Sequence, residues 1–421
     1  MTQTPVATVA IVGGGPAGLM AAEQLSAAGV QVDLYDAMPS VGRKFLLAGR
    51  GGLNLTHAEP FEAFAGRFGE RRAQIEPMLE VFNAQALRDW AQGLGIETFV
   101  GTSKRVFPTD MKAAPLLRAW LHRLRTAGVR FHMRHRWIGW GGEGAALRFA
   151  TPDGEVSVAA EAAVLALGGA SWPRLGSDGA WVPLLRERGI DIAPLQPANC
   201  GFDVGPAGWT PFFAERFAGQ PFKSVAIAFE DGHGRRFSRK GEFVATATGI
   251  EGSLVYAVSA LLRDEIAARG QATLHIDLLP DRSAAQVLAA VQQRGARSLG
   301  SHLKSRLNLD AIKSALLHEV LPREALHDAQ RVAATLKAAL ITVTAARPVA
   351  EAISTAGGVR FEALQADLMA QAVPGLFVAG EMLDWEAPTG GYLLTATLAS
   401  GVVAARGVVR YLAGKGDRRG R

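Results

Sequence analysis

Three glycines near the start of the chain are spaced so that a backbone turn could bind a pyrophosphate. Gly13, Gly15 and Gly18 fit the pattern G-x-G-x-x-G, and Pro16 and Ala17 complete the turn. The first glycine permits a tight bend, the second leaves room for the phosphates, and the third lets the next helix pack closely on its strand. The positive end of that helix would face the phosphate oxygens. The spacing therefore indicates dinucleotide binding.

The elements around this turn are those that the motif requires. A short apolar run, Ala7–Val12, predicts a buried parallel strand, and Ala17–Ala28 predicts the following helix. A second strand, Val32–Tyr35, ends at Asp36, where an acid could accept hydrogen bonds from a ribose. A motif in this context is specific, whereas the glycines alone would be weak evidence. The alternative is an ordinary glycine-rich turn between a strand and a helix.

A second segment, Val41–His57, is rich in glycines and basic residues. It contains Gly42, Gly49, Gly51, Gly52, Arg43, Lys44, Arg50 and Asn54. A core helix would not tolerate so many glycines, so the segment predicts a loop. Such a loop could lie against a planar, partly anionic ligand, because its amides approach closely and its bases offset phosphate charge. A mobile surface loop is the alternative.

Two further buried strands are expected to end in glycines. Ala162–Leu167 precedes Gly168 and Gly169, and Leu376–Ala379 precedes Gly380 and Glu381. Because parallel strands that end beside one another share an edge, these turns could cover the same ligand from other sides. The carboxylate of Glu381 could hold the hydroxyls of a sugar or ribityl chain.

A small-residue helix is expected over about Leu393–Arg406. The amides of Gly390, Gly391 and Tyr392 before it could face the N1/O2 edge of a flavin, where the helix dipole stabilises the anionic reduced form. A purely structural strand–turn–helix unit is the alternative.

Length and composition limit the class of protein. A chain of 421 residues predicts two or three domains, and 48% hydrophobic with 20% charged residues is an ordinary globular balance. The single cysteine, Cys200, excludes an internal disulfide framework, so redox chemistry requires a bound cofactor. We expect a cytoplasmic protein without a membrane partner, because no signal peptide and no apolar run of ~18 residues is apparent.

The middle of the chain changes character. The segment Leu195–Gly252 predicts a β-rich region that could form a small barrel. The segment Ser283–Lys337 predicts helices. Basic residues Arg294, Arg297, Lys304 and Arg306 lie in the helical part, but a solvated helix face is favoured over a nucleic-acid contact. The nine histidines show no metal-binding spacing, so no metal site is expected.

The chain resembles the BaiN/YhiN-type NAD(P)/FAD-dependent oxidoreductases, a branch of the two-dinucleotide-motif flavoproteins that includes an aminoacetone oxidase. The resemblance spans nearly the whole chain. It is carried by Val12–Gly18, Gly42-Arg43-Lys44, Gly49–Asn54, Thr56, Gly168-Gly169, Gly176–Gly179, Lys240-Gly241-Glu242, Gly249, Gly357-Gly358-Val359 and Gly380–Tyr392.

The resemblance implies an α/β fold: a Rossmann-like FAD-binding domain over 1–193 and 345–421, an inserted β-barrel-like domain over 194–257 and 337–344, and a helical insertion over 258–336. It also implies FAD as the cofactor, with the backbone near Trp137 against the adenine. The residues expected to bind FAD are Gly13, Gly15, Pro16, Ala17, Gly18, Asp36, Arg43, Lys44, Gly51, Gly52, Asn54, Trp137, Gly168, Gly169, Gly380, Glu381, Gly391 and Tyr392.

The implied activity is hydride transfer between a small-molecule substrate and flavin N5. Oxygen or a transiently bound NAD(P)H would be the other partner, because only one complete dinucleotide fingerprint is present. A flavoprotein that acts on RNA and a non-catalytic flavin-binding protein are the alternatives. His57, Arg50, Glu386 and Tyr392 are the first polar residues to test, without an assigned catalytic role.

The sequence departs from the common family pattern at two places. Gly-Gly-Leu-Asn at Gly51–Asn54 replaces Gly-Arg-Cys-Asn, which removes a thiol beside the flavin. Trp385-Glu386-Ala387 replaces Val-Asp-Gly, which is expected to place an aromatic ring and a carboxylate near the active-site mouth. The substrate class therefore does not follow from the resemblance.

Overall fold

The chain divides into two compact units, residues 1–196 with 354–421 and residues 197–353. The computed structural model describes residues 8–48, 51–141 and 146–419. The predicted Gly49 and Arg50 thus lie outside the described residues.

The first unit is built on a five-stranded parallel sheet with the order β19-β10-β1-β2-β6. Every residue of β10 and all but the first of β1 are buried, as expected for strands covered on both faces. The order places the three strands with glycine-rich ends, β19, β10 and β1, side by side. The strands are β1 (Thr8–Val12), β2 (Gln31–Asp36), β6 (Arg130–Met133), β10 (Ala162–Leu165) and β19 (Leu376–Val378).

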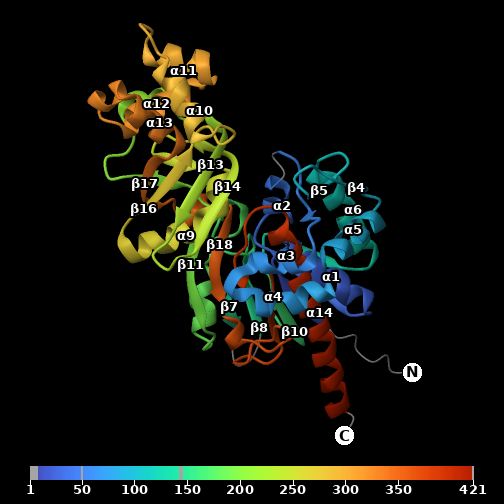
Figure 1. Ribbon diagram of the computed structural model, residues 1–421. Coiled ribbons are helices and arrows are strands. Elements are labelled where there is room, and N and C mark those ends of the chain that lie inside the picture. The colour runs from blue at the N-terminus through green and yellow to red at the C-terminus, as the bar shows by residue number, and fades with distance from the viewer. Residues whose placement is uncertain (1–7, 49–50, 142–145, 420–421) are drawn as a thin grey trace. The chain divides into compact units, whose positions relative to one another are not determined.

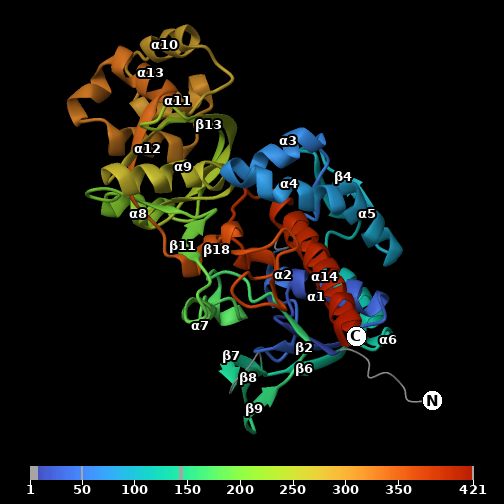
Figure 2. The ribbon, with the colours of Figure 1, turned by 90° about the horizontal axis from the view of Figure 1, so that it is seen from below.

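Helices α1 (Pro16–Ala27) and α14 (Tyr392–Arg419) lie side by side in this unit, drawn in blue and red (Figures 1 and 2). They approach closely because Gly401 has no side chain: a Cβ there would lie 2.5 Å from the carbonyl oxygen of Ala17. A three-stranded sheet packs on β2, since Phe149 of β8 stacks on Tyr35 at 4.5 Å between ring centroids. This sheet contains β7 (Arg136–Gly141), β8 (Ala146–Thr151) and β9 (Gly154–Val158).

A second small sheet, β3-β5-β4, and several helices complete the first unit. The strands of this sheet are β3 (Thr56–His57), β4 (Thr98–Val100) and β5 (Arg105–Pro108), and the helices are α2 (Arg43–Leu47), α3 (Phe61–Ala65), α4 (Arg72–Val81), α5 (Ala84–Gly93), α6 (Ala113–Thr126) and α7 (Trp181–Arg186). The strands β11 (Ile192–Ala198) and β18 (Ser354–Val359) form a separate two-stranded sheet. The 3₁₀ helices described in this unit are η1 (Gly66–Arg71), η2 (Pro173–Leu175), η5 (Phe361–Ala363) and η6 (Gly380–Met382), and those in the second unit are η3 (Arg323–His327) and η4 (Val349–Glu351).

The prediction that Val41–His57 is one loop is wrong in part. Arg43–Leu47 forms the helix α2, and Thr56–His57 forms the strand β3. The glycines flank the five helical residues instead of interrupting them. Gly42 takes the left-handed conformation, with φ 69°, immediately before the helix.

The second unit contains a closed barrel of six strands in the order β12-β15-β14-β13-β16-β17. All neighbouring strands run antiparallel, and inward side chains such as Phe222, Phe243 and Ile276 are fully buried. The predicted fold class, a Rossmann-like domain with an inserted barrel and helices, is confirmed. The strands are β12 (Phe202–Val204), β13 (Pro221–Glu230), β14 (Arg236–Ala245), β15 (Gly249–Glu251), β16 (Ala272–Asp277) and β17 (Ala339–Ala346).

The element bounds of the second unit differ from the predicted partition. The range 258–336, assigned to a helical insertion, includes β16, which pairs with β13 and β17 inside the barrel. Residues 345–353, assigned to the first domain, lie in the second unit. The helices are α8 (Pro211–Phe217), α9 (Ser253–Arg269), α10 (Ala284–Gln292), α11 (Leu299–Leu307), α12 (Ala311–Val320) and α13 (Ala329–Lys337), of which the last four gather together in both views (Figures 1 and 2).

Helix α10 begins with a capping box that offers a test of the second unit. The Ser283 hydroxyl accepts the Gln286 N–H at 3.2 Å, and the Gln286 side chain accepts the Ser283 N–H at 2.9 Å. We expect Ser283→Ala to lower the free energy of unfolding by ~1 kcal/mol, because an orphan amide loses its partner. Ser283→Asp keeps a cap and should stay near wild type in urea unfolding. Equal losses in the two variants would contradict the role of the cap.

Helix α14 is longer and more apolar than expected. By length and composition, the part over Tyr392–Lys415 would suffice to cross a membrane, which corrects the expectation that no apolar run is long enough. However, 67% of its apolar window is buried inside the protein, as in the core helix of a soluble protein. The cytoplasmic location stays a prediction.

Candidate cofactor site

The turn between β1 and α1 combines two crowded glycines with one open glycine. A Cβ on Gly13 (φ 106°) would lie 2.2 Å from the Ala166 oxygen, and one on Gly18 would lie 2.0 Å from the Gly13 oxygen. A Cβ on Gly15 would meet no atom within 4 Å. Gly15 is the N-cap of α1 and has Pro16 after it, so the amides of Ala17 and Gly18 are left without helical partners. The turn therefore offers open space in front of two N–H donors.

The side chain of Asp36, at the end of β2, forms a hydrogen bond with the backbone of this turn. Its Oδ2 accepts the Gly14 N–H at 2.8 Å, and its Oδ1 accepts the Met38 N–H at 2.7 Å. Burial raises the pKa of the carboxyl group, and these two backbone hydrogen bonds and the charge of Arg43 oppose the rise. Each oxygen keeps a lone pair, so acceptance from a ribose remains compatible with this geometry and stays a prediction.

The second glycine-rich segment begins beside the first turn. The Gly42 N–H donates to the Gly14 oxygen at 2.9 Å, which places α2 next to it. A Cβ on Gly51 would meet no atom within 4 Å, whereas one on Gly52 (φ 115°) would lie 2.2 Å from Met111. Leu53 of this segment is 1% exposed.

Lys44 and Glu381 join parts of the chain that are 337 residues apart. The Lys44 Nζ donates to Glu381 Oε2 and to the buried Ser171 hydroxyl, each at 2.6 Å. Glu381 Oε1 accepts the Thr355 N–H at 2.9 Å, and the Gly169 N–H lies 3.5 Å from Oε2. This cluster contains the predicted residues Lys44, Gly169 and Glu381. It therefore joins α2, the turn after β10 and the turn after β19.

Thr355 of β18 was missed by the sequence analysis. Its hydroxyl accepts the amides of Ala170 and Ser171 at 2.9 and 3.2 Å, and a Cβ on Gly169 would lie 2.2 Å from it. It therefore fixes the turn after Gly168 and Gly169. The glycine pair that follows it, Gly357 and Gly358, was the only nearby signal in the sequence.

The start of α14 lies against β3. A Cβ on Gly391 (φ 95°) would lie 2.4 Å from Thr56 Cα, and the hydroxyl of Thr395 donates to that of Thr56 at 2.8 Å. The Gly380 N–H donates to Ser400 Oγ of the same helix at 2.8 Å. The turn at Gly391 thus contacts the second glycine-rich segment, and the turn at Gly380 lies next to Ala17 of α1.

Tyr392 is 5% exposed and packs among aromatic rings. It stacks on His57 at 5.2 Å between centroids and meets the edge of Phe64 at 4.9 Å. Trp385 is also buried, and its Nε1 donates to the Gly380 oxygen at 3.1 Å. Its ring belongs to the core of the first unit, and its placement near the mouth of the active site stays a prediction.

His57 predicts a pH dependence of stability. Burial lowers the pKa of His57 below the ordinary value of 6.5, and the charges of Arg67 and Arg105 lower it further. The charge of Glu59 and the backbone of Ser103 act in the opposite direction and raise it. Because the unfolded state then binds the proton more readily, stability is full above pH 6.5 and falls as the pH drops toward the folded-state pKa. We expect His57→Phe to flatten this slope in thermal unfolding between about pH 5 and 8. His122→Phe, at an exposed position of α6, should keep it; an unchanged slope in His57→Phe would contradict the assignment.

Buried polar atoms without partners test whether these residues fit a cofactor. Trp137 is 7% exposed, and its Nε1 has no hydrogen-bond partner. Among the described side chains, Arg43 Nε, Asn54 Oδ1 and Ser177 Oγ are also buried without a hydrogen-bond partner. Buried polar groups in native proteins are almost always paired, so these four atoms, three of them beside the glycine turns, suit a ligand rich in donors and acceptors. The residues present thus fit a dinucleotide such as FAD.

The predicted residues fall into two neighbouring groups. Gly13–Gly18, Asp36, Arg43, Lys44, Gly168, Gly169, Gly380 and Glu381 surround the carboxyl ends of β1, β10 and β19. Gly391 and Tyr392 lie against Thr56 and His57, directly after Gly51, Gly52 and Asn54 in the chain. Trp137 is the second residue of β7, and just before this strand the His135 N–H donates to the Asp36 backbone oxygen at 2.9 Å. Their contact with FAD stays a prediction.

Comparisons with known proteins agree with this geometry. The chain is 26% identical over 415 residues to a 3-dehydro-bile acid delta(4,6)-reductase of Clostridium scindens, covering 94% of this chain and 98% of that protein. It is 25% identical over 405 residues to a ribosomal RNA dihydrouridine synthase of Escherichia coli, covering 91% and 93%. The fold matches a 3-ketosteroid delta1-dehydrogenase of Sterolibacterium denitrificans with a TM-score of 0.52, 13% identity, and coverage of 96% and 99%.

A family model described as the HI0933-like protein Rossmann domain matches residues 7–407. That match covers most of the chain and includes every predicted cofactor residue. The chain therefore belongs to the HI0933-like Rossmann-domain family and is an FAD-dependent oxidoreductase.

Proposed function

We propose that this flavoprotein transfers hydride between a small-molecule substrate and N5 of FAD, with oxygen or a transiently bound NAD(P)H as the other redox partner. When bound, FAD supplies the flavin that accepts or donates the hydride. The observation that carries the proposal is the meeting of the glycine-ended strands β1, β10 and β19 at one sheet edge, next to buried polar atoms without partners.

The residues of the chain would hold the cofactor in distinct ways. The free amides of Ala17 and Gly18 would bind the pyrophosphate at the start of α1. Glu381, positioned by Lys44, would accept from hydroxyls of the ribityl chain. The amides of Gly391 and Tyr392 would donate to the electron-rich edge of the flavin at the start of α14, whose dipole favours negative charge there.

NAD(P)H is a candidate for a transient partner only. The sequence has one complete G-x-G-x-x-G fingerprint, which follows directly after β1 and is proposed here to bind FAD. A nicotinamide would therefore have to visit the substrate side of the flavin. The reductase of Clostridium scindens supports an unsaturated steroid or bile acid as the first substrate class to test.

Anaerobic spectroscopy of the purified yellow protein tests the proposal. We expect NADH, NADPH or a small amine to bleach the visible flavin band, and a bile-acid 4,6-dien-3-one or oxygen to restore it. Free FAD with the same reagents is the control for uncatalysed reduction. A flavin band that no reductant bleaches, in protein with a full complement of FAD, would contradict hydride transfer.

A second candidate is action on RNA, which the relative from Escherichia coli favours. Arg297, Lys304 and Arg306 in and before α11 are exposed and could contact phosphates. Such binding should weaken steeply with salt, so retention on immobilised ribosomal RNA at low salt should disappear at moderate salt. Triple replacement of these residues by glutamine should abolish it. No retention at low salt would exclude this candidate.

A further inference from the structure

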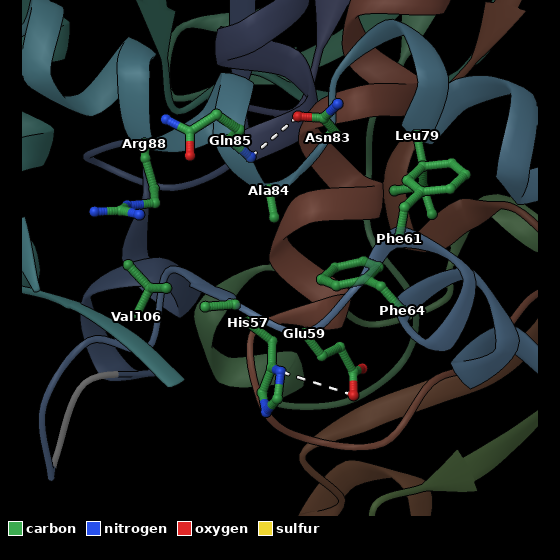
Figure 3. A pocket seen from close by; sticks show the side chains of 11 residues that line it. His57, Glu59, Phe61, Phe64, Leu79, Asn83, Ala84, Gln85, Arg88 and Val106 are labelled. Carbon is green, nitrogen blue, oxygen red and sulfur yellow. Dashed lines mark hydrogen bonds and ion pairs between the residues drawn. The ribbon is translucent and has the colours of Figure 1, made fainter. Parts of the chain in front are cut away.

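A cavity of about 380 Å³ lies in the first unit between β3, β5 and the helices α3, α4 and α5. Figure 3 shows Phe61, Phe64 and Leu79 on one side of it, and Arg88 with Val106 on the other. This volume falls in the range of small-molecule sites, and the walls combine apolar rings with a few polar groups, as such sites do. None of the predicted cofactor residues is among the described residues that line it.

His57 supplies one polar group without a partner. The residue is 8% exposed, and its Nδ1 is buried without a hydrogen bond; the nearest carboxylate oxygen, on Glu59, is 3.9 Å away (Figure 3). A ligand hydroxyl, which can donate or accept, would satisfy this nitrogen in either ring tautomer.

Arg88 supplies an uncompensated positive charge. Its Nε donates to the Thr98 hydroxyl at 3.2 Å, and no ion pair engages its guanidinium among the described residues. The other charges are already balanced: Glu59 takes two hydrogen bonds from Arg67, at 3.0 and 2.7 Å. Burial would raise the pKa of Glu59, but the bonds from Arg67 and Tyr392 hold it below its ordinary value. With the Glu59 carboxylate paired to Arg67, which is outside the lining, Arg88 is the charged group of the described lining that is left to attract an anionic ligand.

We propose that this cavity is a second ligand site that binds a small hydroxylated aromatic carboxylate. The carboxylate pairs with Arg88, the hydroxyl forms a hydrogen bond with His57 Nδ1, and the ring packs against Phe61 and Phe64. Arginine presents a fork of N–H donors that matches a carboxylate. The lining includes none of the residues predicted to hold FAD, although His57 and Phe64 contact the predicted residue Tyr392, and the proposal does not depend on the proposed hydride transfer.

Calorimetric titration of the FAD-loaded protein with 4-hydroxybenzoate and 4-hydroxycinnamate tests the site. We expect saturable binding of at least one of them, without release of FAD. Benzoate, which lacks the hydroxyl, and 4-hydroxybenzyl alcohol, which lacks the carboxylate, should each bind at least about tenfold more weakly, because the first leaves the buried His57 Nδ1 unsatisfied and the second loses the charge-assisted bonds to Arg88.

Two variants locate the binding. Arg88→Gln removes the charge, and Ala84→Phe fills the cavity from the start of α5 while retaining Arg88. Each should weaken 4-hydroxybenzoate by at least about tenfold. Arg118→Gln, at an exposed position of α6, is the matched control and should bind as wild type does. Retained FAD content shows that each variant is folded.

Two results would overturn the proposal. One is the absence of saturable heat with both probes up to about 10 mM, a concentration at which even millimolar affinity would be visible. The other is wild-type affinity in folded Arg88→Gln or Ala84→Phe, because the ligand would then bind elsewhere.

Discussion

Gly15→Asp is expected to weaken FAD binding by about 100-fold, or about 3 kcal/mol, while the fold stays intact. Gly15 has the extended backbone of a helix N-cap, with φ −80° and ψ −179°, and a Cβ there meets no atom within 4 Å. Aspartate is a favoured N-cap residue, so the apoprotein should be as stable as wild type or more stable. Its carboxylate would take the amides of Ala17 and Gly18 and repel the pyrophosphate.

The measurement is the dissociation constant of FAD for each apoprotein, together with its thermal midpoint. Gly66→Asp is the matched control, because a Cβ at Gly66 also meets no atom within 4 Å and its φ is −61°. The control should bind FAD as wild type does. If Gly15→Asp bound FAD with wild-type affinity, the pyrophosphate would not lie at the start of α1.

Lys44→Met is expected to lower the free energy of unfolding by about 2 kcal/mol. The side chains of Lys44 and Glu381 are 29% and 16% exposed, so loss of the ammonium group leaves a largely buried carboxylate with its Oε2 short of a strong donor. The cost is less than for a fully buried pair, because water reaches part of both groups. The variant should also lose FAD, since Glu381 would no longer be held in place.

A double-mutant cycle separates this ion pair from other effects. Lys44→Met with Glu381→Gln should cost about 1–2 kcal/mol less than the sum of the single changes in urea unfolding. Lys112→Met, at an exposed position, is the control and should change stability little. If the two single costs were additive, the bond between Lys44 and Glu381 would not couple the segments.

The parallel sheet and its ligand edge could be predicted because the pattern is local. Ala162–Leu165 and Leu376–Val378 are short apolar runs that stop at glycines, which is the signature of a buried strand followed by a tight turn. Their adjacency to β1 followed from the rule that such ends share an edge, and the order β19-β10-β1 confirms it.

Other parts of the site depend on long-range contacts that no local pattern encodes. Thr355 acts through amides almost two hundred residues away in the sequence, and Lys44 meets Glu381 across 337 residues. β16 was separated from the barrel because its partners, β13 and β17, lie on either side of it in the chain at different distances. The cavity beside His57 likewise follows only from packing, because its walls come from five separate elements.

Hydrogen–deuterium exchange of the apoprotein with and without FAD tests the central claim most directly. The claim is that the turns after β1 and β19, and the segment before β3, hold one FAD together. We predict that FAD slows exchange in peptides covering Gly13–Gly18, Gly51–Asn54 and Gly380–Tyr392 at the same FAD concentration. Protection confined to one of these peptides, with wild-type exchange in the other two, would contradict the claim.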